Sequence, residues 1–127
     1  MAIDRDIRVL VVDDSAIWRA FIIRHLLEAG MRTVYVAYDG IQAVYKARTL
    51  QPDLILMDVT LPHMNGISAA AAIREAVPTA KVVFVSSNCD HDVRNAALNA
   101  GASGFVLKSL AGRQLIDAIR LVFPLPS

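Results

Sequence analysis

The amino-acid sequence predicts an α/β fold, a three-layer doubly wound sandwich in which helices cover both faces of a five-stranded parallel sheet. The first observation is a set of short runs that are apolar almost throughout, as in strands buried on both faces. The second is that these runs alternate with helical segments through short loops, which favours parallel pairing with right-handed crossovers. For five such units we expect the flavodoxin-like strand order 2-1-3-4-5.

The first strand is expected at residues 7–12, where the chain is almost continuously apolar. Residues 15–29 are expected to form a helix that ends at Gly30, because glycine readily takes the left-handed conformation at a helix C-terminus. The apolar positions of this helix are expected to pack in the core; they are Ile17, Phe21, Ile22 and Leu26.

The second strand is expected at residues 32–37, which are rich in β-branched and aromatic side chains. Asp39 is expected to cap a helix that runs to about residue 49, and Pro52 prevents its continuation. Residues 53–57 then form the third strand.

The second half of the chain continues this alternation. After a proline-containing loop, Asn65-Gly66 opens an alanine-rich helix to about residue 76, and Pro78 ends it. The remaining elements are expected to be a strand at 81–86, a helix at 90–99 ended by Gly101, a strand at 104–107 and a closing helix at 111–122.

Composition indicates one globular domain of 127 residues, with 55% hydrophobic and 20% charged residues. The formal net charge is +1 without a basic cluster, so we expect no direct nucleic-acid binding. No apolar stretch is long enough to span a bilayer, and the N-terminus lacks the layout of a signal peptide, so a cytoplasmic protein without membrane association is expected. The single cysteine, Cys89, excludes an internal disulfide and a multi-cysteine metal site.

Charged side chains follow three of the predicted strands at the point where each ends. Asp13 and Asp14 follow the first strand, Asp58 the third and Lys108 the fifth. Ligands of parallel sheets bind outside the carboxyl ends of the strands, and the first and third strands are neighbours in the expected order. The three carboxylates are therefore expected to meet and to repel one another unless a cation intervenes. An all-oxygen set of this kind suits Mg²⁺.

This arrangement predicts phosphoryl chemistry. A fixed ammonium opposite a metal ion can stabilise the oxygens of a phosphoryl group during transfer. Ser86, at the end of the fourth strand, supplies a hydroxyl that can bond a phosphate oxygen. Asp58 lies between these groups and is placed to act as the nucleophile that forms an aspartyl-phosphate.

These residues resemble the receiver domains of two-component response regulators, over about residues 7–122. The resemblance implies a single receiver domain over residues 1–127, with its core at about 7–122. The matching segments, in order, are Val11-Val12-Asp13-Asp14-Ser15, Asp39-Gly40, Asp58 to Gly66, Val85-Ser86 and Ala100 to Lys108.

The resemblance implies that a histidine kinase or phosphotransfer protein phosphorylates Asp58, in a Mg²⁺-dependent reaction. It implies no enzyme activity beyond the domain's own phosphoryl transfer and dephosphorylation. The implied catalytic residues are Asp58, Lys108 and Ser86; the implied switch residues are Ser86 and Phe105; the implied metal ligands are Asp13, Asp14, Asp58 and the backbone carbonyl of Thr60. Asp14 is the expected direct ligand of the acidic pair.

The resemblance also implies an output. Phosphorylation is expected to switch the surface of the fourth helix, fifth strand and fifth helix, through which a homodimer could form. Three departures from the common family pattern are Ser109 in place of proline, Phe105 in place of tyrosine and Asn65 in place of aspartate. The Ser86-Ser87-Asn88 stretch and the missing proline are most similar to LuxR/NarL-type transcription regulators. The alternative is a stand-alone receiver that acts in a phosphorelay or in protein–protein regulation without a DNA-binding domain.

Three other functions compete with this interpretation. A phosphohydrolase of the haloacid-dehalogenase type would place its nucleophile on the first strand and an acid two residues later. In this sequence Asp58 follows the third strand, and the residue two positions later is Thr60, which is not an acid. A dinucleotide or flavin binder would share the fold, but no glycine-rich phosphate loop is present. A degenerate receiver that acts only as a docking module would not need all five site residues. Trp18 is expected near the rim of the site.

Overall fold

The structure, a computed structural model, describes residues 6–88 and 90–124, so Cys89 and the two ends of the chain lie outside the described residues. Five parallel strands form one sheet in the order β2-β1-β3-β4-β5, which confirms the predicted order. The strands are β1 (Arg8–Val12), β2 (Thr33–Ala37), β3 (Leu54–Met57), β4 (Lys81–Ser86) and β5 (Gly104–Leu107).

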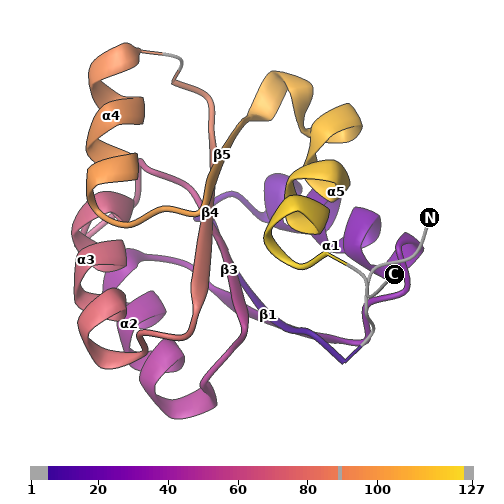
Figure 1. The fold of residues 1–127 in the computed structure, drawn as a ribbon, viewed down its shortest axis with the longest axis horizontal. Helices are drawn as coiled ribbons and strands as arrows, with labels where there is room; N and C mark the ends of the chain where they lie inside the picture. The colour runs from indigo at the N-terminus through magenta and orange to yellow at the C-terminus, as the bar shows by residue number, and fades with distance from the viewer. Residues whose placement is uncertain (1–5, 89, 125–127) are drawn as a thin grey trace.

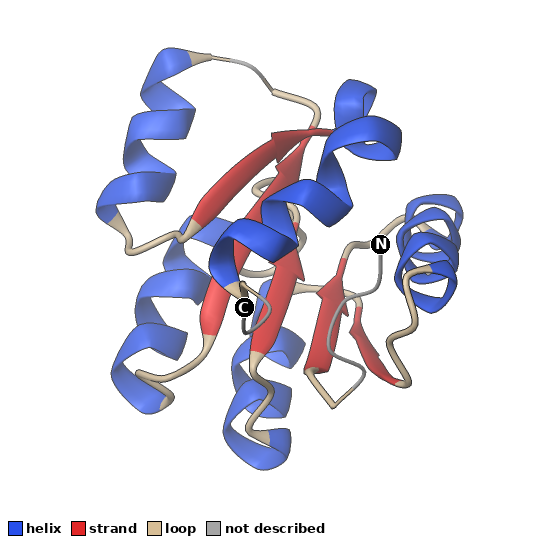
Figure 2. Cartoon of the chain, turned by 45° about the vertical axis from the view of Figure 1, so that its right-hand side comes forward, coloured by secondary structure: helices blue, strands red, loops and turns tan. Residues whose placement is uncertain are grey.

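Helices cover both faces of the sheet, as the three-layer prediction requires. Figure 1 shows α2 (Gly40–Leu50), α3 (Gly66–Ala76) and α4 (His91–Asn99) on one face, and α1 (Ala16–Glu28) and α5 (Ala111–Val122) on the other. The strands run between these two layers in the turned view of Figure 2. No helix in the described part of the chain combines the length and the apolar character needed to cross a bilayer.

The sheet divides the core into two clusters. Along β1, Leu10 and Val12 pack toward α2 and α3, whereas Val9 and Val11 pack toward α1 and α5. Both clusters consist of buried side chains, because successive residues of a strand point to opposite faces. This two-sided burial is the reason that the strands read as continuous apolar runs rather than as alternating ones.

The helix ends follow the chemistry of their capping residues. Asp39 caps α2, with its carboxylate accepting the Gln42 N–H at 2.7 Å, and Asn65 caps α3 in the same way. Gly30 and Gly101 have φ angles of 97° and 98°, the left-handed conformation that favours glycine. All predicted bounds agree with the observed ones to within one residue, but a short 3₁₀ helix, η1 (Lys108–Leu110), was not predicted.

One predicted core position is wrong. Ile17 is 82% exposed, whereas Ile22 and Leu26 of the same helix are buried. At 3.6 residues per turn, Ile17 lies about 180° around the helix axis from Leu26, so both cannot face the sheet. The stripe of α1 that contacts the sheet is therefore narrower than the apolar pattern indicated.

Candidate functional site

The strand pairing brings two of the predicted carboxylates together. Val12 of β1 is in register with Met57 of β3, so Asp13 and Asp58 follow neighbouring strands at the same level. The Asp58 N–H continues the ladder by donating to the carbonyl of Val12 at 3.0 Å. Carboxylate oxygens of Asp13, Asp14 and Asp58 all lie within 4.8 Å of one another. The predicted acidic cluster is therefore present at the carboxyl edge of the sheet.

Lys108 reaches this cluster from the end of β5, an edge strand of the sheet. It is the first residue of η1, immediately after β5, and β4 separates that strand from β3. Its Nζ lies 2.8 Å from Asp13 Oδ2 and 2.9 Å from Asp58 Oδ2. The side chain of Lys108 is 9% exposed, so the ammonium bridges two carboxylates with little access to water.

Each of the two buried carboxylates is held in the same way. The N–H of Ser15 donates to Asp13 Oδ1 at 2.9 Å, and the N–H of Thr60 donates to Asp58 Oδ1 at 3.2 Å. These are bonds from the backbone two residues further on, which aspartate forms readily at turns. One oxygen of each carboxylate is thus fixed by the backbone, and the other faces the ammonium of Lys108.

Burial and charge act against each other at the two ionisable groups that face one another. Burial raises the pKa of Asp58, and the nearby charge of Asp13 adds to this, while Lys108 and the Thr60 N–H oppose it. For Lys108, burial acts to lower the pKa, but the carboxylates of Asp13 and Asp58 outweigh it and raise the pKa above its ordinary value. Lys108 is therefore a fixed cation at neutral pH.

The donor set of the cluster fits a hard divalent cation. Asp13 Oδ2 is buried and accepts no aligned hydrogen bond despite its ionic contact with Lys108, so it retains capacity as a ligand. Asp14 is exposed and offers a further carboxylate beside it. Oxygen ligands in small number suit Mg²⁺, which keeps part of its water shell. Asp13, Asp14 and Asp58 would hold such an ion, which supplies positive charge for the oxygens of a phosphoryl group.

The predicted switch residues lie on the two strands beyond β3. Ser86 ends β4 and is buried, and its Oγ accepts the N–H of Asn88 at 3.1 Å. Phe105 is half-buried on β5, with its ring centroid 6.5 Å from that of Phe84 and the Arg94 guanidinium 5.9 Å away. The roles of Ser86 and Phe105, and of the carbonyl of the exposed Thr60, stay predictions.

Several contacts of the site were not predicted. A Cβ at Gly66 would collide with the carbonyl oxygen of Asp58, so this loop requires glycine; the Asn65-Gly66 pair was a signal of the helix start but not of this contact. The Arg19 Nη1 donates to the carbonyl of Asp13 at 2.8 Å, and nothing in the sequence marks it. Trp18 lies at the site, as predicted, with Lys108 Nζ 4.9 Å from its ring centroid.

The acidic pair does not cap the first helix. Ser15 is the N-cap of α1, and its Oγ accepts the N–H of Trp18 at 3.3 Å. Asp13 instead points its carboxylate at Lys108 and the Ser15 N–H. Asp13 and Asp14 are therefore not the N-cap of α1, and both carboxylates lie in the cluster.

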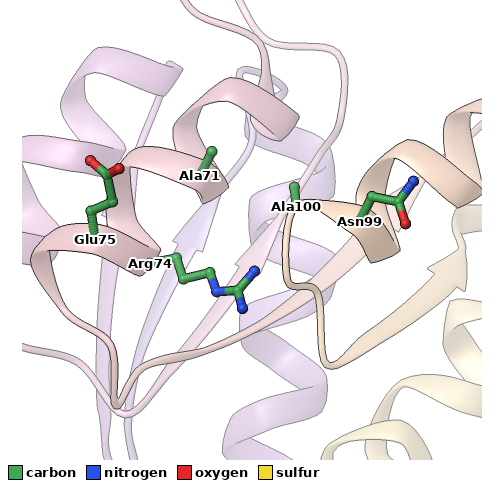
Figure 3. A pocket seen from close by; sticks show the side chains of 5 residues that line it. All are labelled: Ala71, Arg74, Glu75, Asn99 and Ala100. Atoms are coloured by element: carbon green, nitrogen blue, oxygen red, sulfur yellow. The ribbon is translucent and has the colours of Figure 1, made fainter.

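A groove of about 420 Å³ lies away from this site, between the C-terminal ends of α3 and α4. Its lining residues are Ala71, Arg74, Glu75, Asn99 and Ala100 (Figure 3). The Arg74 side chain, including its guanidinium, lies close to Gly101. Because helices in βα units run opposite to their strands, this groove lies toward the edge of the sheet remote from the carboxylates.

The sequence matches the family model of the response regulator receiver domain over residues 9–120. The chain belongs to this receiver family. The receiver is 35% identical over 115 residues to the chemotaxis protein CheY of Thermotoga maritima, which covers 91% of the chain and 96% of that protein. It is 40% identical over 119 residues to response regulator GacA of Pseudomonas viridiflava, covering 92% of the chain but 55% of GacA. The chain thus spans about half the length of that relative.

Solved structures agree with this membership. A chain in the CheX–CheY–BeF₃–Mg²⁺ complex from Borrelia burgdorferi matches the receiver with a TM-score of 0.87 at 28% identity, covering 92% of this chain and 89% of that one. The family predicted from the sequence is confirmed, and with it a phosphoacceptor role in two-component signalling.

Proposed function

We propose that Asp58 is the phosphoacceptor of this receiver and that Mg²⁺, held by Asp13, Asp14, Asp58 and the Thr60 carbonyl, is required for its phosphorylation. The observation that supports this most directly is the position of Asp58, which belongs both to the acidic cluster and to the contact with Lys108. Its Oδ1 is fixed by the Thr60 N–H, and its Oδ2 is the oxygen that faces Lys108.

In the proposed reaction, an Asp58 oxygen attacks the phosphorus of a phosphohistidine or a small acyl phosphate. The new O–P bond forms as the bond from phosphorus to the leaving group breaks, and the electron pair leaves with that group. The Lys108 ammonium, 2.9 Å from Asp58 Oδ2, lies within reach of the phosphoryl oxygens and stabilises their charge. We propose no catalysis beyond this transfer and the later hydrolysis.

Phosphorylation is proposed to act through Ser86 and Phe105. The Ser86 hydroxyl would exchange its bond with the Asn88 N–H for one with the phosphoryl group. Phe105 would then move into the space that Ser86 leaves, because packed interiors tolerate voids poorly. Phe105 borders a groove of about 430 Å³ on the α4–β5–α5 face; its other lining residues are His91, Arg94, Leu107, Leu110 and Gln114. This face is the proposed output surface and the proposed interface of a homodimer.

We propose a histidine kinase or phosphotransfer protein as the phosphodonor, in the cytoplasm, with residues 1–127 as one receiver domain. Control of transcription is the proposed output, on the similarity of the Ser86-Ser87-Asn88 segment to LuxR/NarL-type regulators and on the match to the longer protein GacA. A stand-alone role in a phosphorelay is the second candidate, because the match to the Thermotoga CheY covers 96% of that protein.

The chemistry is tested by intact mass after incubation with acetyl phosphate and Mg²⁺. We expect one phosphoryl adduct in the wild type and none in Asp58→Asn or in the presence of a chelator. Ser86→Ala should still accept the phosphoryl group but should fail to alter the α4–β5–α5 face, as followed by hydrogen exchange. An adduct that persists in Asp58→Asn would disprove the assignment, and a normal response of Ser86→Ala would disprove the switch.

A further inference from the structure

The ammonium of Lys108 has a third neighbour besides its two carboxylates. The ring centroid of Trp18 lies 4.9 Å from Nζ, within the range of a cation–π contact. The other two neighbours are Asp13 Oδ2 at 2.8 Å and Asp58 Oδ2 at 2.9 Å. The ammonium is therefore enclosed by two negative groups and one aromatic ring, which explains how a lysine can be 9% exposed while it remains charged.

The indole is held by its own neighbours rather than by Lys108. The Trp18 N–H is bonded to the Ser15 Oγ at the start of α1, which fixes the backbone. The Phe21 ring meets the indole edge to face, at 5.2 Å and 71°. Phe21 in turn stacks on His25 at 4.4 Å and lies near Gly112 of α5. Trp18 thus belongs to an aromatic row along α1 that is packed against the neighbouring helix.

The three contacts of the ammonium differ in how the reaction affects them. Asp58 becomes esterified, and Asp13 is a proposed ligand of the metal ion, so both ionic contacts change when the site is loaded and phosphorylated. The contact with Trp18 depends on neither event, because the Ser15 cap fixes the backbone of Trp18 and the Phe21 ring packs against its indole.

We propose that Trp18 is a positioning residue for phosphoryl transfer, whose ring holds the Lys108 ammonium over the acidic cluster while its ionic partners change. This inference rests on the proposed phosphorylation of Asp58 and adds a residue outside the acidic cluster and the switch pair. A cation–π contact of this kind changes an equilibrium by about two- to thirtyfold. We therefore expect removal of the ring to slow phosphorylation by about tenfold.

The test compares Trp18→Phe and Trp18→Leu with the wild type. Phenylalanine keeps an aromatic face that binds cations more weakly than indole, whereas leucine fills space without one. We expect the rate constant for phosphorylation by acetyl phosphate to fall in the order wild type, Phe, Leu. Tyr45→Leu is the matched control, because Tyr45 is 69% exposed on α2 and should leave the rate unchanged. Equal rates for Phe and Leu in folded variants would overturn the inference.

A double-mutant cycle shows whether Trp18 acts through Lys108. In a Lys108→Met background, Trp18→Leu should cause no further loss of rate, because the cation that it positions is gone. A further loss as large as that in the wild-type background would assign Trp18 a merely structural role and overturn the inference. A wild type that accepts no phosphoryl group would refute the proposed function and this inference together.

A second readout does not require phosphorylation. Trp18 is the single tryptophan of the chain, so the emission of the protein reports on this ring. We expect Lys108→Met to change the emission intensity of the metal-free protein, whereas Lys81→Met, at an exposed position of β4, should not. Emission that is identical in Lys108→Met and the wild type would show that the contact is absent and would overturn the inference, while the role of Asp58 would stand.

Discussion

Lys108 should stabilise the receiver in the absence of a metal ion, and Lys108→Met tests this. Methionine keeps an unbranched side chain but removes the ammonium that contacts Asp13 at 2.8 Å and Asp58 at 2.9 Å. Both carboxylates are buried, so neither can replace that contact fully with water. Removing one partner of a buried ion pair typically costs about 3–5 kcal/mol.

The expected cost here is smaller than that range. Exposed Asp14 shows that water reaches one side of the cluster, which screens the charges. The pKa of Asp58 is also raised by burial already, so this carboxyl can take up a proton when the cation is lost. We therefore expect Lys108→Met to lower the free energy of unfolding by about 2–3 kcal/mol at pH 7.

Urea unfolding at pH 7 is the assay. With a slope of about 1–3 kcal/mol per molar urea, the unfolding midpoint of Lys108→Met should fall by about 0.7–3 M. The difference in unfolding free energy between the wild type and Lys108→Met should decrease as the pH is lowered, because Asp58 is then neutral. It should also decrease when Mg²⁺ is added, because the ion replaces the lost positive charge. Lys81→Met, at an exposed site, should change stability by no more than about 0.5 kcal/mol.

The reasoning fails if Lys108→Met unfolds at the wild-type midpoint. It also fails if the loss of unfolding free energy stays constant as the pH is lowered, or if it is the same with and without Mg²⁺. Either result would mean that the methionine variant loses packing of the lysine stem rather than neutralisation of the two carboxylates.

Three further predictions concern single residues around the site. Asp58→Asn should raise the free energy of unfolding at pH 7 without Mg²⁺, because burial raises the pKa of Asp58 and so disfavours its ionised form in the folded chain. The stability from this group is present at low pH and is lost as the pH rises through the folded-state pKa, so the urea midpoints of the variant and the wild type should converge on acidification. Gly66→Ala should destabilise by about 2 kcal/mol or more, because its Cβ collides with the Asp58 carbonyl, whereas Gly112→Ala, with a nearest contact of 3.6 Å, should be tolerated in thermal melts. Asp39→Ala should cost about 1 kcal/mol, a fall in Tm of about 4 °C by circular dichroism, because it removes the cap of α2; an unchanged Tm would show that the cap is dispensable.

The fold and the membership of the acidic cluster could be predicted because both follow from strand ends. An apolar run that stops at Asp13, Asp58 or Lys108 marks the point where a buried strand emerges, and parallel topology brings all such points to one edge. No side-chain conformation has to be known for this conclusion. The pattern therefore predicted which groups meet.

The rest depends on rotations that the pattern does not contain. Ile17 and Leu26 are both apolar, but only packing against the sheet decides which of them is buried. The direct bridge from Lys108 to both carboxylates, and the ring of Trp18 beside it, depend on the course of η1 and on side-chain torsions. The contact of Gly66 with the Asp58 backbone likewise arises from the path of the β3–α3 loop.

The buried cluster combines stability and reactivity in one set of contacts. Lys108 compensates two carboxylates whose burial would otherwise favour protonation, so the folded chain tolerates the site before any ion is bound. The same compensation is incomplete, since the pKa of Asp58 remains raised. A dication or a phosphoryl group can therefore take over part of this charge balance. We infer that the ammonium can exchange its partners without disruption of the sheet edge, because the backbone bonds from Ser15 and Thr60 hold the carboxylates independently of it.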